Sequence, residues 1–156
     1  MECSNGRPSM HHRLTTAVLA VSVAFWSASA DDPTADEMKN WEGEWREISF
    51  EYEGKKWAKG DAGFKAAPMI VKANELTMNG RRKTFKLNPA KSPKEIDLTS
   101  HDGVETGQIH LGIYKLEKNQ LTICMPFFAT GARPTEFKRD ADNGMTLMVF
   151  ERVNPK

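Results

Sequence analysis

The residues of this chain that could do chemistry are two histidines, two acidic residues and one cysteine. His101 and Asp102 lie in a predicted turn, Glu105 follows them, and His110 lies in a predicted strand. A zinc site needs three or four converging ligands. A turn and a strand do not bring these side chains together, so we expect solvated histidines and no metal. Cys124 has no Cys/His/Asn arrangement around it, and we interpret it as a small core hydrophobe.

Two adjacent aromatic residues, Phe127 and Phe128, are the best candidates for binding. They lie in a predicted loop, where neighbours are not easily both buried, and exposed aromatic side chains are typical of ligand mouths and protein contacts. With Tyr114 and Arg133 they form our candidate ligand-binding set. No glycine-rich phosphate loop, nucleophile elbow or evident carboxylate pair occurs in the sequence, so we expect neither an enzyme nor a cofactor.

The first thirty residues have the pattern of a secretory signal peptide. An apolar run over 14–26 follows His11-His12-Arg13 and precedes Ala28-Ser29-Ala30, a small-x-small cleavage motif. The run is too short to span a bilayer as a stable helix. We expect cleavage after this motif and release into the periplasm or outside the cell, with Met1 or Met10 as the start. The alternative is a buried N-terminal helix.

The mature chain is electrically balanced. Removing Arg7, Arg13 and Glu2 from the 22 basic and 21 acidic residues leaves no net charge, which argues against nucleic acid or an anionic membrane as partner. The run 81–83 (Arg-Arg-Lys) is most simply the solvated face of a hairpin. Cys3 leaves with the signal peptide, so no intramolecular disulfide is possible and the fold depends on its apolar core.

The pattern after Trp41 has a period of two, which is typical of β-strands. We expect residues 31–41 to be polar with a short helix, and 42–154 to form one domain of eight or nine strands. Short connections, such as the type I′ turn predicted at Asn79-Gly80, require antiparallel neighbours. A meander of this length removes its edges best by closing into a small up-and-down barrel. A two-sheet β-sandwich is the alternative.

Sixteen large apolar residues are expected to face one interior. They are Ile48, Phe50, Met69, Val71, Leu76, Met78, Phe85, Leu87, Ile96, Leu98, Leu111, Ile113, Leu121, Ile123, Met148 and Phe150. An eight-stranded barrel is just wide enough to be filled by side chains or to hold one small ligand. The sequence leaves both possibilities open.

Several blocks of the sequence resemble a known family. They are Gly43-Glu44-Trp45, Ile96-Asp97-Leu98-Thr99, Leu111-Gly112-Ile113-Tyr114, Leu121-Thr122-Ile123-Cys124 and Arg133-Pro134-Thr135-Glu136-Phe137. In this order they resemble an uncharacterised family of exported planctomycete proteins with a lipocalin-like (calycin-type) domain. The resemblance implies a barrel and export, and it brings no catalytic residue. Gly43-Glu44-Trp45 also resembles the G-x-W signature of lipocalins, and Val149-Phe150-Glu151-Arg152-Val153 resembles the closing strand of fatty-acid-binding-type barrels. These two resemblances imply a structural signature of Gly43, Trp45 and Arg152, in which the arginine lies against the tryptophan.

Two functions agree with these patterns. The first is an exported barrel that binds a small apolar molecule, or a peptide, at its open end. The second is a protein-interaction module of the cell envelope whose barrel is solid and whose loops carry the function. The two are discriminated by whether the barrel encloses a cavity of a few hundred Å³, the usual size of a ligand pocket.

Overall fold

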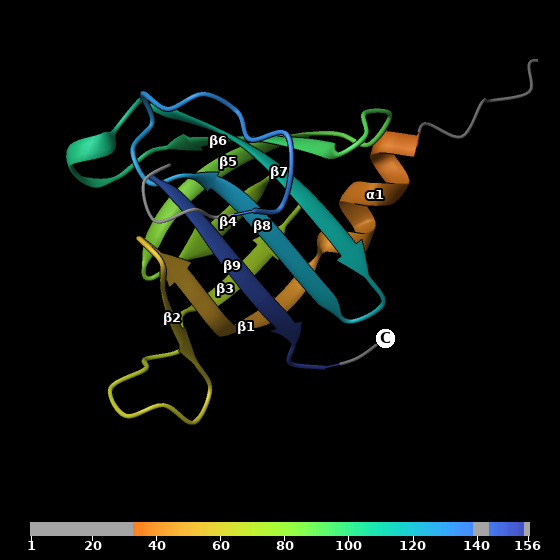
Figure 1. Ribbon diagram of the computed structural model, residues 1–156. Helices are drawn as coiled ribbons and strands as arrows, with labels where there is room; N and C mark the ends of the chain where they lie inside the picture. The colour runs from red at the N-terminus through yellow and green to blue at the C-terminus, as the bar shows by residue number, and fades with distance from the viewer. Residues whose placement is uncertain (1–32, 139–143, 155–156) are drawn as a thin grey trace, which may run out of the picture. The chain divides into compact units, whose positions relative to one another are not determined.

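The computed structural model describes residues 33–138 and 144–154, and the predicted signal peptide lies outside this part of the chain. Helix α1 (Pro33–Trp41) comes first and strands follow it (Figure 1). The strands are β1 (Gly43–Tyr52), β2 (Lys55–Ala58), β3 (Pro68–Lys72), β4 (Glu75–Met78), β5 (Arg81–Asn88), β6 (Lys94–Ser100), β7 (Ile109–Glu117), β8 (Gln120–Pro126) and β9 (Met145–Arg152). A short 3-10 helix, η1 (Gly103–Glu105), precedes β7. Within the described residues, no helix has the length and apolar character needed to cross a membrane.

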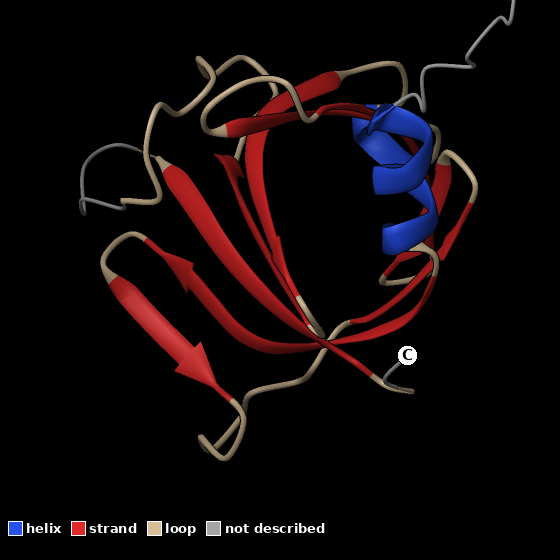
Figure 2. Ribbon diagram, turned by 90° about the vertical axis from the view of Figure 1, so that its right-hand side faces the viewer, coloured by secondary structure: helices blue, strands red, loops and turns tan. Residues whose placement is uncertain are grey.

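Eight of these strands form a closed antiparallel barrel. They pair in the order β1-β3-β4-β5-β6-β7-β8-β9, and β9 pairs with β1 to close the ring, which Figure 2 shows from one end. Tight turns dictate this order: Asn79 and Gly80 both have positive φ, of 54° and 72°, as a two-residue hairpin turn requires. The structure confirms the predicted all-β barrel in place of the two-sheet sandwich.

Strand β2 is an extra strand outside the ring. The first part of β1 pairs with β3, from Gly43 to Arg46, whereas the second part pairs with β2, from Ser49 to Tyr52. Both strands therefore approach the same edge of β1, and the loop 59–67 connects them. Because β3 pairs with only the first part of β1, the wall of the barrel is interrupted near the end of β1.

Helix α1 closes the end of the barrel at which β1 begins. It lies within the outline of the ring of strands in Figure 2. Its last residue, Trp41, is fully buried, stacks on Phe85 with ring centroids 5.2 Å apart and meets the edge of Tyr114 at 5.1 Å. The Trp41 carbonyl accepts a hydrogen bond of 2.7 Å from Trp45 Nε1. The apolar core thus lies under the helix.

The predicted signature of Gly43, Trp45 and Arg152 forms part of this closure. Trp45 is opposite Arg152 in the register of β1 and β9, and the guanidinium lies 4.1 Å from the centroid of the buried indole. The same guanidinium donates to the carbonyls of Asn40 and Glu42, at 2.5 and 2.6 Å, and so caps the C-terminus of α1. Gly43 has a φ of 123°, and a Cβ there would lie 3.0 Å from Arg152 Nη1. The contact predicted from the sequence is confirmed.

Two strands correct the predicted interior. Glu47 faces the interior in step with Trp45, and a β-bulge between Glu47 and Ser49 makes Ile48 an extra residue, so that Phe50 faces the interior as well and Ile48 is outside the core cluster. On β7 the inward residues are His110 and Tyr114.

The placement of Leu111 and Ile113 follows from this, because they alternate with the inward residues of β7 and therefore face outward. Ile113 is nevertheless buried and pairs with buried Cys124 on β8. Burial therefore does not distinguish a residue that faces the interior of the barrel from one that faces outward.

Candidate functional site: a cavity at the mouth of the barrel

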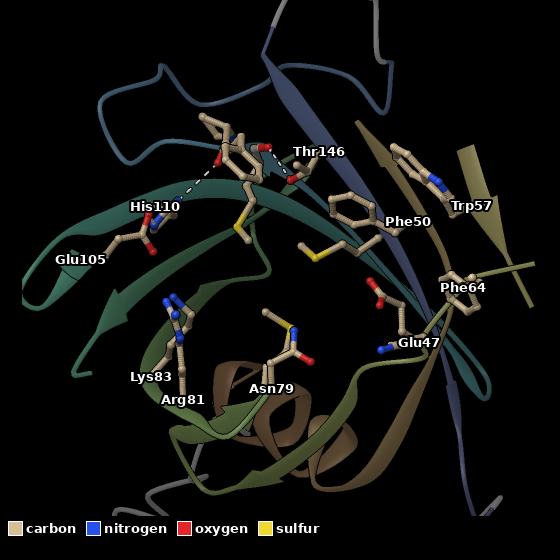
Figure 3. Close-up of a pocket in the computed structure, with 17 residues that line it drawn as sticks. Glu47, Phe50, Trp57, Phe64, Asn79, Arg81, Lys83, Glu105, His110 and Thr146 are labelled. Atoms are coloured by element: carbon tan, nitrogen blue, oxygen red, sulfur yellow. Dashed lines mark hydrogen bonds and ion pairs between the residues drawn. The ribbon is translucent and has the colours of Figure 1, made fainter. Parts of the chain in front are cut away.

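The barrel has an open cavity of about 690 Å³ at the end opposite α1 (Figure 3). Its walls come from the end of β1, from β4, β5, β7, β8 and β9, and from the loops around the mouth. The lining residues are Glu47, Phe50, Trp57, Gly63, Phe64, Lys65, Met78, Asn79, Arg81, Lys83, Glu105, His110, Met125, Pro126, Phe127, Thr146 and Met148. The volume falls within the range of about 300–1,000 Å³ that small-molecule sites occupy.

One part of the wall is apolar and adaptable. Met78, Met125 and Met148 project from β4, β8 and β9, and Phe50 and Phe127 adjoin them. Methionine is unbranched and polarizable, so its side chain adjusts to ligands of different shape. This part of the wall is suited to a chain or ring without polar groups.

Another part of the wall is basic, and Lys83 is at its centre. Arg81 and Lys83 lie on the same face of β5 as the core residue Phe85, and both line the cavity. The prediction that the run 81–83 is a solvated face is therefore wrong for Lys83. Only 8% of Lys83 is exposed, and its Nζ donates a hydrogen bond of 2.5 Å to Ser100 Oγ. Burial lowers the pKa of the Lys83 ammonium; Glu105 opposes this shift and Arg81 adds to it.

His110 lies beside this basic wall and is 3% exposed, so the prediction of a solvated histidine is wrong for this residue. Its Nδ1 is 3.3 Å from the carbonyl of Pro126, which can only accept a hydrogen bond. Its Nε2 is 3.4 Å from Glu105 Oε1. Nδ1 therefore faces a backbone acceptor, whereas Nε2 approaches the Glu105 carboxylate but makes no hydrogen bond within the described residues. His101 is exposed and contacts Thr84 Oγ1 at 2.9 Å.

Glu47 stands on the other side of the cavity from Arg81 and Lys83 (Figure 3). It is 6% exposed, and its Oε2 accepts one hydrogen bond of 3.3 Å, from the backbone N–H of Ala67. Burial raises the pKa of the Glu47 carboxyl, and the hydrogen bond from Ala67 offsets part of that rise. The backbone N–H of Glu47 also donates to the Ala67 carbonyl, so Glu47 holds the start of β3 against β1.

Aromatic side chains form the rim of the cavity. Phe127 stacks on Tyr52 with centroids 4.4 Å apart, and Phe128 meets the edge of Phe127 at 4.9 Å. Phe127 is 42% exposed and lines the cavity, whereas Phe128 is 63% exposed and does not. The predicted pair is therefore split between the mouth and the outer surface.

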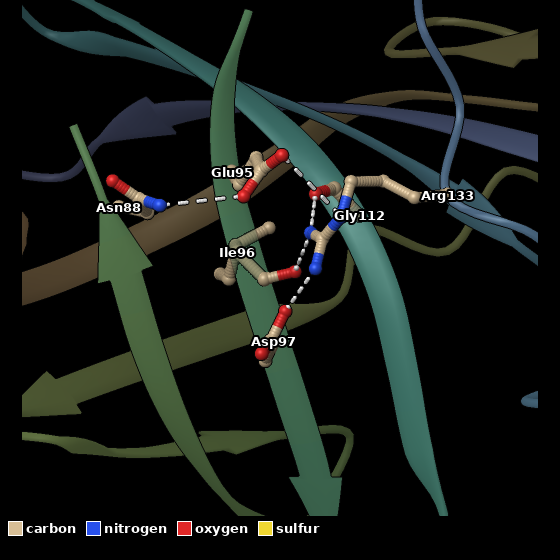
Figure 4. A network of polar contacts seen from close by, with 6 residues as sticks. All are labelled: Asn88, Glu95, Ile96, Asp97, Gly112 and Arg133. Atoms are coloured by element: carbon tan, nitrogen blue, oxygen red, sulfur yellow. Dashed lines mark hydrogen bonds and ion pairs between the residues drawn. The ribbon is translucent and has the colours of Figure 1, made fainter. Parts of the chain in front are cut away.

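Tyr114 and Arg133, the other two candidate ligand-binding residues, do not line the cavity. Tyr114 belongs to the core beneath α1, where burial and the charge of Glu37 raise the pKa of its hydroxyl. Arg133 lies on the outer face of the barrel, as Figure 4 shows. It donates to the carbonyls of Ile96 and Gly112 and to Asp97 Oδ1, at 3.1, 2.6 and 2.5 Å. This network anchors the segment after β8 to β6 and β7.

Cys124 and the acidic residues form no metal site in the part of the chain that the structure describes. No three His, Cys, Asp or Glu side chains there converge closely enough to hold an ion. Cys124 is fully buried, and burial raises the pKa of its thiol to about 11. A raised pKa keeps the thiol protonated, and the thiolate is the nucleophilic form.

The polar residues of the lining could have been predicted from the periodicity of the strands. Lys83 lies two residues before Phe85, His110 four before Tyr114, and Thr146 two before Met148, each in step with inward residues of its strand. The pattern of period two therefore continues through polar residues. Counting only apolar positions missed them, because a charged residue at the end of a strand is more often solvated.

Comparison with known proteins does not identify the chain. No protein-family model matches it, and no curated protein or solved structure matches it significantly. What the protein does must therefore be inferred from the geometry of the cavity.

Proposed function

We propose that this protein binds a small, largely apolar molecule in the cavity at the mouth of its barrel. The observation that carries the proposal is the cavity of about 690 Å³, which the side chains of the eight strands leave open. A barrel of this size has room for one small ligand when its interior is not filled. The protein acts by binding, without catalysis and without a cofactor.

The division of the interior supports this proposal. The largest core side chains, among them Trp41, Trp45 and Phe85, are packed under α1. The mouth half instead has methionines and charged residues, with aromatic side chains at its rim. Burial of apolar ligand surface contributes about 25 cal/mol per Å² to the free energy of binding. Flexible methionines adjust to the ligand, so that ligands of different shape can bury their apolar surface.

The alternative is a protein-interaction module, and one observation favours it. Phe128 is 63% exposed and lies beside the mouth without lining the cavity. Exposed aromatic residues often anchor protein contacts. In this alternative the loop after β8 carries the function and the cavity is incidental.

The proposal also includes export. The pattern of the first thirty residues, together with the resemblance to exported planctomycete proteins, supports release into the periplasm or outside the cell. The ligand is then a molecule met outside the cytoplasm.

A neutral environment-sensitive dye, N-phenyl-1-naphthylamine, tests the proposal. We expect one dye per mature protein, with fluorescence that rises on binding and falls on addition of decan-1-ol. Phe127→Ala should weaken dye binding by about threefold to tenfold, because it removes apolar lining of the order of 1 kcal/mol. Phe128→Ala is the matched control and should bind the dye normally.

The opposite pattern contradicts ligand binding. Absence of stoichiometric dye binding by protein with a normal circular dichroism spectrum would favour the interaction module. So would an effect of Phe128→Ala that equals the effect of Phe127→Ala.

A further inference from the structure

We propose that the ligand of the cavity carries an anionic group, a carboxylate or a phosphate, which Lys83 binds with help from Arg81 and His110. The inference rests on the proposed function and adds the chemical class of the ligand. It places the anion against β5 and β7 and the apolar part of the molecule against the methionines of β4, β8 and β9.

Lys83 is the first reason. Its side chain is more than nine-tenths buried and is directed into the cavity. An ammonium has three N–H donors, and Ser100 Oγ accepts one of them. Among the described residues no carboxylate lies within 4.0 Å of Nζ to neutralise the charge. A buried cation without a counter-ion is unfavourable, and an anion in the cavity would relieve this.

The groups around Lys83 are the second reason. Arg81 lies two residues before it on the same strand and lines the same cavity. His110 is buried and lines the same cavity, and its Nε2 makes no hydrogen bond within the described residues. Glu105 is the one acidic group of this wall, and its carboxylate is directed at His110 Nε2. The wall therefore keeps a net positive charge.

The charges of the whole lining agree with this. Three basic residues (Lys65, Arg81, Lys83) and two acidic residues (Glu47, Glu105) line the cavity, so basic residues outnumber acidic ones in the lining. Glu47 lies on the side away from Arg81 and Lys83 (Figure 3). An anion held by Lys83 would therefore lie away from the carboxylate of Glu47.

The apolar surroundings strengthen the interaction. Met125 and Met148 line the same cavity and give it apolar surface beside the polar wall. Charged hydrogen bonds are stronger where the local dielectric constant is low. A carboxylate or phosphate on an otherwise apolar molecule therefore fits the lining better than a neutral polar group.

Three ligands with the same ten-carbon chain test the inference: decanoate, decyl phosphate and decan-1-ol. Each is titrated against the dye complex of the mature protein at neutral pH. We expect one or both anions to bind at least about tenfold more tightly than decan-1-ol, the difference that one charged hydrogen bond contributes. Decanoate and decyl phosphate distinguish the two sources of anionic charge.

Lys83→Met is the decisive variant, because methionine keeps the length of the side chain and removes the charge. We expect it to abolish the preference for anions and to leave the affinity for decan-1-ol within about twofold. Lys86→Met is the matched control: this exposed lysine lies on the outer face of the same strand, and its loss should keep the preference. Arg81→Gln, at an exposed position on the mouth, should reduce the preference for anions over decan-1-ol. It provides the test if Lys83→Met does not fold.

The outcomes separate the inference from the proposed function. If decan-1-ol and the anions bind equally to the wild type, or if Lys83→Met keeps the preference, the anionic site is overturned while ligand binding stands. If neither the dye nor any ten-carbon ligand binds, the proposed function itself fails.

Discussion

Glu47 illustrates how one residue changes the character of the interior. Its carboxyl faces inward in step with Trp45, where it accepts one hydrogen bond from the Ala67 N–H and is otherwise desolvated. Burial raises its pKa, so the folded protein holds the proton more tightly than the unfolded chain does. The ionised form of Glu47 therefore lowers stability at neutral pH, and this effect disappears once the carboxyl is protonated in both states.

We predict that Glu47→Gln increases the free energy of unfolding at neutral pH. Glutamine keeps an oxygen that can accept the hydrogen bond from Ala67 and carries no charge to desolvate. The gain should shrink as the pH falls, and should be absent below the usual carboxyl pKa of 4.5. Urea denaturation at neutral pH and at a pH below 4.5 measures the change in the free energy of unfolding.

Glu44→Gln is the control for this prediction, because Glu44 is exposed on the same strand. It should leave stability nearly unchanged at both pH values. A loss of stability in Glu47→Gln at neutral pH, or a gain that does not depend on pH, would show that the carboxylate is a stabilising partner instead.

At the scale of elements, the closure of the barrel depends on the contact between β1, β9 and α1. Arg152 connects all three: it lies against Trp45 of β1, belongs to β9 and caps the last carbonyls of α1. The period-two pattern and the short turns predicted the pairing of the first and last strands. They did not predict the helix cap, because a hydrogen bond between positions 40 and 152 has no local signal.

We predict that Trp45→Ala destabilises the protein by about 3–5 kcal/mol, since a fully buried indole is lost from the core. Arg152→Ala should cost less, about 2–3 kcal/mol, because it removes two charged hydrogen bonds and the contact with the indole. Urea denaturation measures both values. Arg46→Ala, at an exposed neighbour on β1, should change stability by less than about 0.5 kcal/mol.

The prediction for closure has a clear counter-outcome. If Arg152→Ala unfolds at the same urea concentration as the wild type, the cap and the cation–π contact contribute nothing. The closed end would then depend on the apolar residues alone.

For the whole molecule, the two ends of the barrel differ in what fills them. The end under α1 has large aromatic and aliphatic side chains, and the mouth has methionines and charged residues around an open volume. This division makes one end responsible for stability and the other available for a ligand. Export, which we propose, would bring the mouth into contact with molecules outside the cytoplasm.

We predict that exported protein begins at Asp31, because Ala28-Ser29-Ala30 fits the specificity of signal peptidase. N-terminal sequencing of protein recovered from the periplasm or the medium decides this. Recovery of a chain that begins at Met1 or Met10, in the cytoplasm alone, would overturn the proposal of export and leave the barrel untouched.

The sequence by itself determined the fold class, the antiparallel order of the strands and the contact of Trp45 with Arg152. The fold class and the strand order follow from the alternation of side chains and from the reach of short turns, and the contact follows from pairing the first strand with the last. The tertiary structure decided which side of the wall Glu47, Lys83 and His110 occupy, and whether the interior is filled. The physical reason is that one bulge reverses alternation, and an enclosed volume depends on how all the strands pack together.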